Sequence, residues 1–236
     1  MRLLVTLATM LLATGPQPRW MSQVRYEYSR RLRCILFGVL AALLTGCATQ
    51  KLYYDIELTE TERPAQASER YGNQKITTIQ ERGVTKCVFE DEMIKAVWMI
   101  PTPFGVSLVL TNKTNHSIMI IWDESAFVDE NRVSHRALHS GIKYRNHDNP
   151  QSPSVVAQNG TIQDLIIPAD RIHYVGGQKY GGWALYPLFT TLTAEESGTK
   201  GTHYIKKTIQ VLLALQIEDV VNKYIFTFDV KNVEIK

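Results

Sequence analysis

The chain has 236 residues, of which 21% are charged, and a formal net charge of +3. Six arginines and one acidic residue fall within the first 46 residues, so the remainder holds 20 basic and 22 acidic residues and is close to −2. This balance excludes the basic footprint of a nucleic-acid-binding protein. The remainder is long enough for one domain with a sizeable core.

The first 46 residues have the pattern of an export signal. Arginines at 30, 31 and 33 precede an apolar run over 34–44, and small residues follow, which is the order in a signal peptide. A start at Met21 gives a leader of 26 residues, a usual length, so we expect Met21 to be the true start. The alternatives are a simple secretory signal and a retained membrane anchor, although the uncharged run over 34–50 is short for a spanning helix.

The end of this leader, Leu44-Thr45-Gly46-Cys47, resembles the lipobox of bacterial lipoproteins. The resemblance implies cleavage between Gly46 and Cys47, a thioether-linked lipid on Cys47, and acylation of the new amino terminus with a fatty acid such as palmitate. Ala48 in place of an aspartate implies sorting to the outer membrane, with the protein facing the periplasm. Residues 47–50 are then a lipidated tether.

Residues 51–236 are expected to form a single domain of short strands. Leu52, Tyr54, Ile56 and Leu58 alternate with polar residues, which predicts a half-buried strand. Residues 59–85 are polar and contain proline and glycine, so we expect a loose connection with a short strand near 76–79.

Alternation and turn signals continue to the end of the chain. Further strands are expected at 93–100, 106–110, 118–122, 126–128, 133–138, 155, 161–167, 208–217 and 224–234. Turn signals at intervals of about 8–12 residues are typical of sandwiches and barrels. We therefore predict an all-β fold, an immunoglobulin-like antiparallel β-sandwich, in which Trp98 and Trp122 are buried.

Two short motifs resemble an uncharacterised group of bacterial β-sandwich lipoproteins. They are Phe89-Glu90-Asp91, after an early aromatic strand, and Asn112-Lys113-Thr114, within a strand pair. The resemblance covers roughly residues 53–134. It supports the fold and implies no activity.

No constellation of residues points firmly to catalysis or to a metal. His135 and His139 would share the face of a helix, but their surroundings predict strand and loop, so we expect exposed loop histidines. Asp123, Glu124, Asp129 and Glu130 flank one strand and could serve glycoside hydrolysis or calcium binding, although strand ends are commonly acidic. Once Cys34 leaves with the signal and Cys47 carries lipid, Cys87 has no disulfide partner and is expected to be a small core residue. We expect no cofactor and no metal.

The glycine-rich segment 174–186 is the best candidate for recognition. It combines four glycines with Tyr174, Tyr180, Trp183 and Tyr186, and tyrosine and tryptophan are enriched in contact hot spots. The alternative is that Trp183 and Tyr186 plug one end of the sandwich.

The sequence thus favours a lipid-anchored envelope lipoprotein that acts without catalysis, as a binding or structural module facing the periplasm. Its partner would be an envelope protein or a glycan. The competing hypothesis is an envelope glycan hydrolase or glycan-binding protein, and a further one is a lipoprotein of a secretion apparatus.

Overall fold

The computed structural model describes residues 52–81, 84–102, 104–176, 181–189 and 202–235. All of them belong to the compact unit Thr49–Lys236. Gly46, Cys47 and Tyr180, which carry predictions made above, lie outside the described residues.

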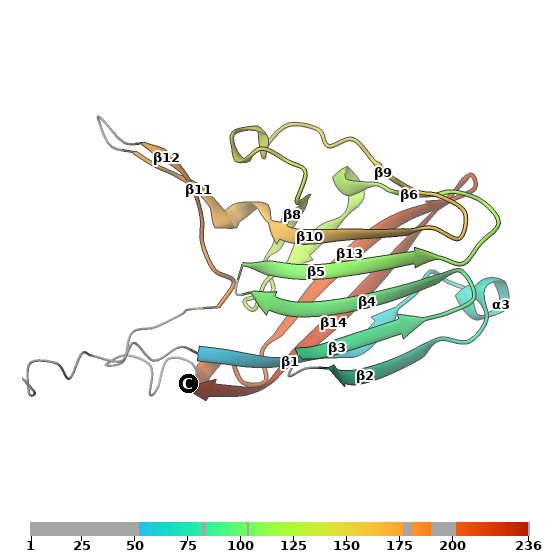
Figure 1. The fold of residues 1–236 in the computed structure, drawn as a ribbon, viewed down its shortest axis with the longest axis horizontal. Helices are drawn as coiled ribbons and strands as arrows, with labels where there is room; N and C mark the ends of the chain where they lie inside the picture. Colours follow the sequence, from blue (N-terminus) through green and yellow to red (C-terminus); the bar gives the residue numbers. More distant parts are fainter. Residues whose placement is uncertain (1–51, 82–83, 103, 177–180, 190–201, 236) are drawn as a thin grey trace, which may run out of the picture. The chain divides into compact units, whose positions relative to one another are not determined.

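The described unit is built almost entirely of antiparallel strands, which confirms the all-β prediction (Figure 1). The strands are β1 (Leu52–Glu62), β2 (Lys75–Glu81), β3 (Val84–Glu90), β4 (Ile94–Thr102), β5 (Gly105–Asn112), β6 (Ile118–Ile120), β7 (Ala126–Val128), β8 (Ser134–His139), β9 (Ser154–Val156), β10 (Thr161–Pro168), β11 (Ile172–Val175), β12 (Gly182–Leu185), β13 (Thr208–Ile217) and β14 (Val220–Ile235). The helical turns are α3 (Ala67–Tyr71), η1 (Trp122–Glu124), η2 (Tyr144–Asn146), η3 (Ala169–Arg171) and η4 (Thr202–Tyr204).

Twelve strands form one hydrogen-bonded sheet, in which ten follow the order β1-β14-β13-β7-β8-β10-β5-β4-β3-β2. Off this path, β6 pairs with β13, and β9 pairs with β6. Strand β8 joins the two halves of this path, which are β1-β14-β13-β7 and β10-β5-β4-β3-β2. It pairs with β7 on one side and with β10 on the other. The two halves are therefore continuous at this edge, where a simple sandwich would have two separate sheets.

Aromatic side chains fill the space between the two halves. The ring of Trp98 on β4 lies 4.6 Å from the ring of Phe226 on β14, and Phe89 on β3 lies 5.4 Å from Phe226. Trp98 and Trp122 are 1% and 0% exposed, as predicted from the alternation of their strands. Such edge-on and tilted ring pairs stabilise a core beyond the area that they bury.

Cys87 belongs to this core, as expected. Its Sγ accepts the Leu58 N–H at 3.2 Å, which joins β3 to β1 across the interior. Burial raises the pKa of the thiol, so Cys87 is a poor nucleophile.

Within residues 59–85, the short strand expected near 76–79 is present as β2, and the remainder is more ordered than the loose connection that was expected. This segment holds the end of β1, the helix α3 and the edge strand β2. The full extent of β2 was hard to predict because none of its side chains is fully buried, so it lacks the apolar face that gives a strand its alternation. Its threonines and isoleucines still suit a strand.

The two motifs that resemble other lipoproteins meet in space. Lys113 Nζ donates to Glu90 Oε1 at 2.9 Å and to the Asp91 carbonyl at 2.6 Å. The Asn112 amide, itself fully buried, donates to the carbonyls of His116, Val156 and Ala157. Both motifs therefore close turns at one end of the sheet.

Candidate functional site

The segment predicted as a recognition loop is a β-hairpin that stands apart from the main sheet (Figure 1). Strands β11 and β12 form a two-stranded sheet of their own, in which Tyr174 lies opposite Trp183 and His173 opposite Ala184. A hairpin of two four-residue strands is marginally stable by itself. Its shape must therefore depend on side-chain packing and on its attachment to the domain.

Aromatic rings pack on both faces of the hairpin. On one face the ring centroids of Tyr174 and Trp183 are 5.5 Å apart, and the His147 ring lies 5.1 Å from Trp183. On the other face the rings of His173 and Tyr186 are 5.0 Å apart. Tyr174, Trp183 and Tyr186 are nevertheless 60%, 39% and 47% exposed. Trp183 and Tyr186 are thus too exposed to be a plug inside the sheet. Tyr180, between Tyr174 and Trp183 in sequence, lies outside the described residues.

Glycine makes this packing possible at one position. An added Cβ on Gly181 would lie 2.2 Å from the Tyr174 hydroxyl oxygen, whereas an added Cβ on Gly182 would meet nothing within 4 Å. The Tyr174 ring therefore lies against the bare backbone of Gly181, a close approach that only glycine permits.

Arg171 ties the base of the hairpin to the domain. The Tyr186 N–H donates to the Arg171 carbonyl at 2.7 Å, and the Arg171 guanidinium reaches the Pro187 carbonyl and the Glu130 carboxylate. Next in the chain, the Ile172 side chain is buried. The hairpin is thereby fixed at its base while its outer part stays exposed.

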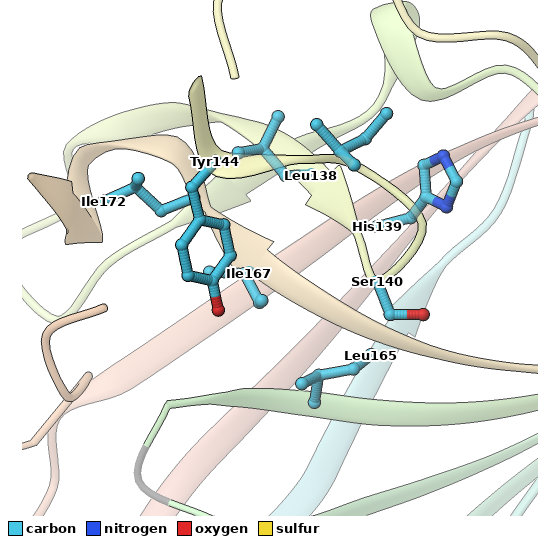
Figure 2. Close-up of a pocket in the computed structure, with 8 residues that line it drawn as sticks. Leu138, His139, Ser140, Tyr144, Leu165, Ile167 and Ile172 are labelled. Atoms are coloured by element: carbon cyan, nitrogen blue, oxygen red, sulfur yellow. The ribbon is translucent and has the colours of Figure 1, made fainter. Parts of the chain in front are cut away.

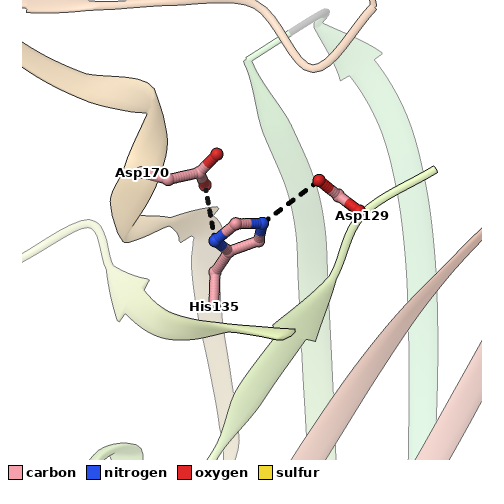
Figure 3. Close-up of side chains that lie close together, drawn as sticks. All are labelled: Asp129, His135 and Asp170. Carbon is pink, nitrogen blue, oxygen red and sulfur yellow. Dashed lines mark hydrogen bonds and ion pairs between the residues drawn. The ribbon is translucent and has the colours of Figure 1, made fainter. Parts of the chain in front are cut away.

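A histidine held between two carboxylates lies beside this base (Figure 3). His135 Nε2 is 3.2 Å from Asp129 Oδ2, and His135 Nδ1 is 3.4 Å from Asp170 Oδ1. The contact to Asp170 lies within ion-pair range but lacks hydrogen-bond geometry, so Asp170 Oδ1 is a buried oxygen without a hydrogen bond. The sequence prediction of exposed loop histidines is wrong, because His135 and His139 lie on β8 with side chains only 16% exposed.

The environment of Asp129 favours its carboxylate form. Burial acts to raise the pKa of Asp129, but the N–H groups of Val133 and Asn131 and the ring of His135 outweigh burial, so its pKa is lowered. Asp129, His135 and Asp170 could each offer one ligand atom to a cation, within 4.8 Å of one another. Because both ring nitrogens already face carboxylates, His135 joins the β7–β8 turn to η3.

A small apolar pocket of about 110 Å³ lies next to the hairpin (Figure 2). Its lining is Leu138, His139, Ser140, Ile142, Tyr144, Leu165, Ile167 and Ile172. Ser140 Oγ donates to Asp164 Oδ1 at 2.8 Å, and His139 Nδ1 lies 3.4 Å from Asp164 Oδ2. A nucleophilic serine needs its hydroxyl bonded to the base. Here Ser140 and His139 both face the carboxylate, so the three residues do not form a catalytic relay.

Three of the acidic residues considered as possible catalytic or calcium-binding groups form ion pairs with three different cations. Asp123 binds Arg136, which lowers the pKa of Asp123. Glu130 binds Arg171, and Glu124 lies 3.6 Å from Lys223. Each of these carboxylates thus has its own cation.

Asp91, of the motif noted in the sequence, is a buried structural group. Its Oδ1 accepts the N–H groups of Met93 and Ile94 at 2.9 Å, and its Oδ2 accepts the Tyr224 hydroxyl at 3.2 Å and lies 3.6 Å from Arg63. Burial raises the pKa of Asp91 despite these partners.

No family model, no curated protein and no solved structure matches this chain. Within the described ranges, none of the helices has the length and apolar character needed to cross a membrane.

Proposed function

We propose that this chain is a lipid-anchored lipoprotein of the bacterial cell envelope whose β domain is a non-enzymatic binding module, with the β11–β12 hairpin as its recognition element. The observation that carries the proposal is the exposure of Tyr174, Trp183 and Tyr186 on a hairpin outside the main sheet. Exposed apolar patches commonly mark interaction sites. Tyrosine and tryptophan supply much contact area at low entropic cost.

The anchor in this proposal is the lipid on Cys47, placed there by the lipobox Leu44-Thr45-Gly46-Cys47. A single acyl chain holds a protein only marginally, whereas two or more lipid chains anchor it stably. The residue after the cysteine, Ala48, favours the outer membrane, with the domain facing the periplasm.

A glycan hydrolase is the competing function. It would need two carboxyl groups flanking one glycosidic bond. Asp123 and Glu130 are held by arginines, and Asp129 accepts two backbone N–H groups. These engagements favour a binding module, whose partner can still be a glycan. A secretion-apparatus lipoprotein rests on fold analogy alone.

We also propose a specific fold for the domain. We place the domain among the immunoglobulin-like sandwiches because its two halves face each other across one aromatic core. The continuity through β8 is a feature of barrels, so an experimental structure in which β8 leaves one of its two neighbours would support the sandwich.

The recognition element is tested by capture of its partner. The variant Tyr174→Ala/Trp183→Ala of the full chain is expressed in cells, crosslinked and purified from membranes. We expect it to lose a stoichiometric envelope component that the wild type captures, with an unchanged melting temperature, because the hairpin lies outside the main core.

The matched control is Val155→Ala, which alters an equally exposed side chain on β9. It should retain capture. Equal capture by all three proteins, or release of sugar from purified glycan by the wild type, would contradict the proposal.

A further inference from the structure

The strand registers define two ends of the described sheet. Leu52, where β1 begins, pairs with Ile235, and the same end holds the β2–β3, β4–β5 and β7–β8 turns, the start of β13 and the exit of β10 into the hairpin. We call this the Leu52 end (Figure 1). The opposite end holds α3 and the β3–β4, β5–β6 and β13–β14 connections.

Exposed aromatic side chains gather at the Leu52 end. Among the described residues, all the aromatic side chains that are largely exposed lie there: Tyr53, Phe104, Tyr174, Trp183 and Tyr186. They come from β1, the β4–β5 turn and the hairpin, which are far apart in sequence. At the opposite end, the exposed large apolar side chains of the described residues are the valines Val155, Val220 and Val221. The exposed aromatic side chains of the described residues are thus concentrated at one end of the domain.

The same end carries exposed cations that form no ion pair with another described residue. Arg132, Lys206 and Lys207 are exposed there, and Lys143 and Arg145 are exposed on the segment whose His147 touches Trp183. None of the five forms an ion pair with another described residue. Exposed acids lie at both ends, with Glu62, Glu69, Glu92 and Asp219 at the opposite end and Glu81 and Glu234 at the Leu52 end, where Glu81 pairs with Lys86.

The tether brings this end close to the lipid. Cys47 precedes Leu52 by five residues, and five residues span at most about 17 Å even when fully extended. A domain anchored through Cys47 must therefore keep Leu52 within about 17 Å of the bilayer surface.

We infer that the Leu52 end docks on the surface of a bilayer with anionic head groups. This inference rests on the proposed function, since it uses the lipid on Cys47. Tryptophan and tyrosine settle at the boundary between head groups and acyl chains. Lysine and arginine side chains are attracted to an anionic lipid surface. The lipid anchor and the aromatic, cationic end together hold the domain in one orientation.

Trp183 provides the test. After removal of the leader the protein keeps three tryptophans, of which Trp98 and Trp122 are buried and only Trp183 is exposed. The mature lipoprotein is reconstituted into phosphatidylglycerol-containing vesicles whose acyl chains carry bromine, which quenches nearby tryptophan. We expect quenching and a blue shift of the Trp183 emission, and loss of this quenched component in Trp183→Phe.

A reporter at the far end is the matched control. Val155→Trp in the Trp183→Phe background places the only exposed tryptophan at the opposite end, and we expect no quenching. Lys206→Glu/Lys207→Glu should weaken the quenching of Trp183 in anionic vesicles and leave it unchanged in zwitterionic ones.

The outcomes separate the two proposals because intact mass reports lipidation independently of fluorescence. A lipidated protein whose Trp183 is quenched no more than the far-end reporter would overturn the docking and leave the anchor standing. A protein without lipid on Cys47 would overturn the proposed function, and the docking inference with it.

Discussion

The adjacent acidic residues Glu90 and Asp91 contribute very different amounts to the stability of the fold. Asp91 is buried and bound to Tyr224, Arg63 and two backbone N–H groups, whereas its neighbour Glu90 forms a surface pair with Lys113. Removing one partner of a buried charge pair costs about 3–5 kcal/mol, while a surface pair contributes at most about 1 kcal/mol.

Asp91→Ala should therefore lower the free energy of unfolding by about 3 kcal/mol or more, because it leaves the Tyr224 hydroxyl and two N–H groups without their acceptor and Arg63 without its ion-pair partner. Glu90→Ala is the control and should cost less than about 1 kcal/mol. Urea denaturation of the two variants measures the difference. Similar losses would show that Asp91 does not hold this turn.

Asp129 should make stability fall in acid. Its pKa is lowered in the folded protein, so its stabilising contribution is complete above the unfolded value of about 3.9 and is lost as pH falls through the folded value. Asp129→Asn keeps an oxygen to accept the N–H groups of Asn131 and Val133 but carries no charge. The difference in unfolding free energy between wild type and Asp129→Asn should shrink when denaturation is repeated below about pH 4. A constant difference across pH would contradict this assignment.

At the level of elements, strands that bury more of their side chains were predicted more accurately from the sequence. Strand β13 was predicted with its exact bounds, Thr208–Ile217, because it lies between neighbours on both sides and its core-facing residues alternate strictly. The edge strand β2 and the hairpin β11–β12 expose most of their side chains. They carry little of the burial pattern on which such prediction depends.

The candidate site could be predicted in composition but not in geometry. The glycines and aromatic residues of segment 174–186 mark it in the sequence, and Tyr174, Trp183 and Tyr186 are indeed exposed. The contact of His147 with Trp183 and the cluster of Asp129, His135 and Asp170 join residues that are far apart in the chain. Sequence spacing has no signal for such contacts, and the pairing of β8 with β10 creates several of them.

The hairpin offers a matched glycine pair for testing its packing. Gly181→Ala should displace the Tyr174 ring, because the new Cβ would lie 2.2 Å from its hydroxyl oxygen, whereas Gly182→Ala meets open space. We expect faster proteolysis within the hairpin of Gly181→Ala, while both variants keep the wild-type melting temperature. Equal protection of the two variants would show that Tyr174 does not brace the hairpin.

At the scale of the whole molecule, the regular spacing of turns was enough to predict an all-β fold, since each short strand needs its own reversal of direction. The strand order was not predictable, because it depends on pairings between strands distant in sequence, such as β1 with β14. The gathering of aromatic side chains at the Leu52 end follows from that order. The end that carries these aromatic side chains is also the end to which the proposed lipidated tether connects.

Both the proposed function and the proposed membrane docking depend most directly on the lipid at Cys47. The decisive measurement is the intact mass and membrane fractionation of the wild type beside Cys47→Ser. We predict a wild type that begins at Cys47, carries the added mass of a diacylglyceryl group and an acyl chain, and stays with the membrane, while Cys47→Ser is released or remains an uncleaved precursor. An unmodified wild type, or a variant with wild-type mass, cleavage and fractionation, would contradict the account.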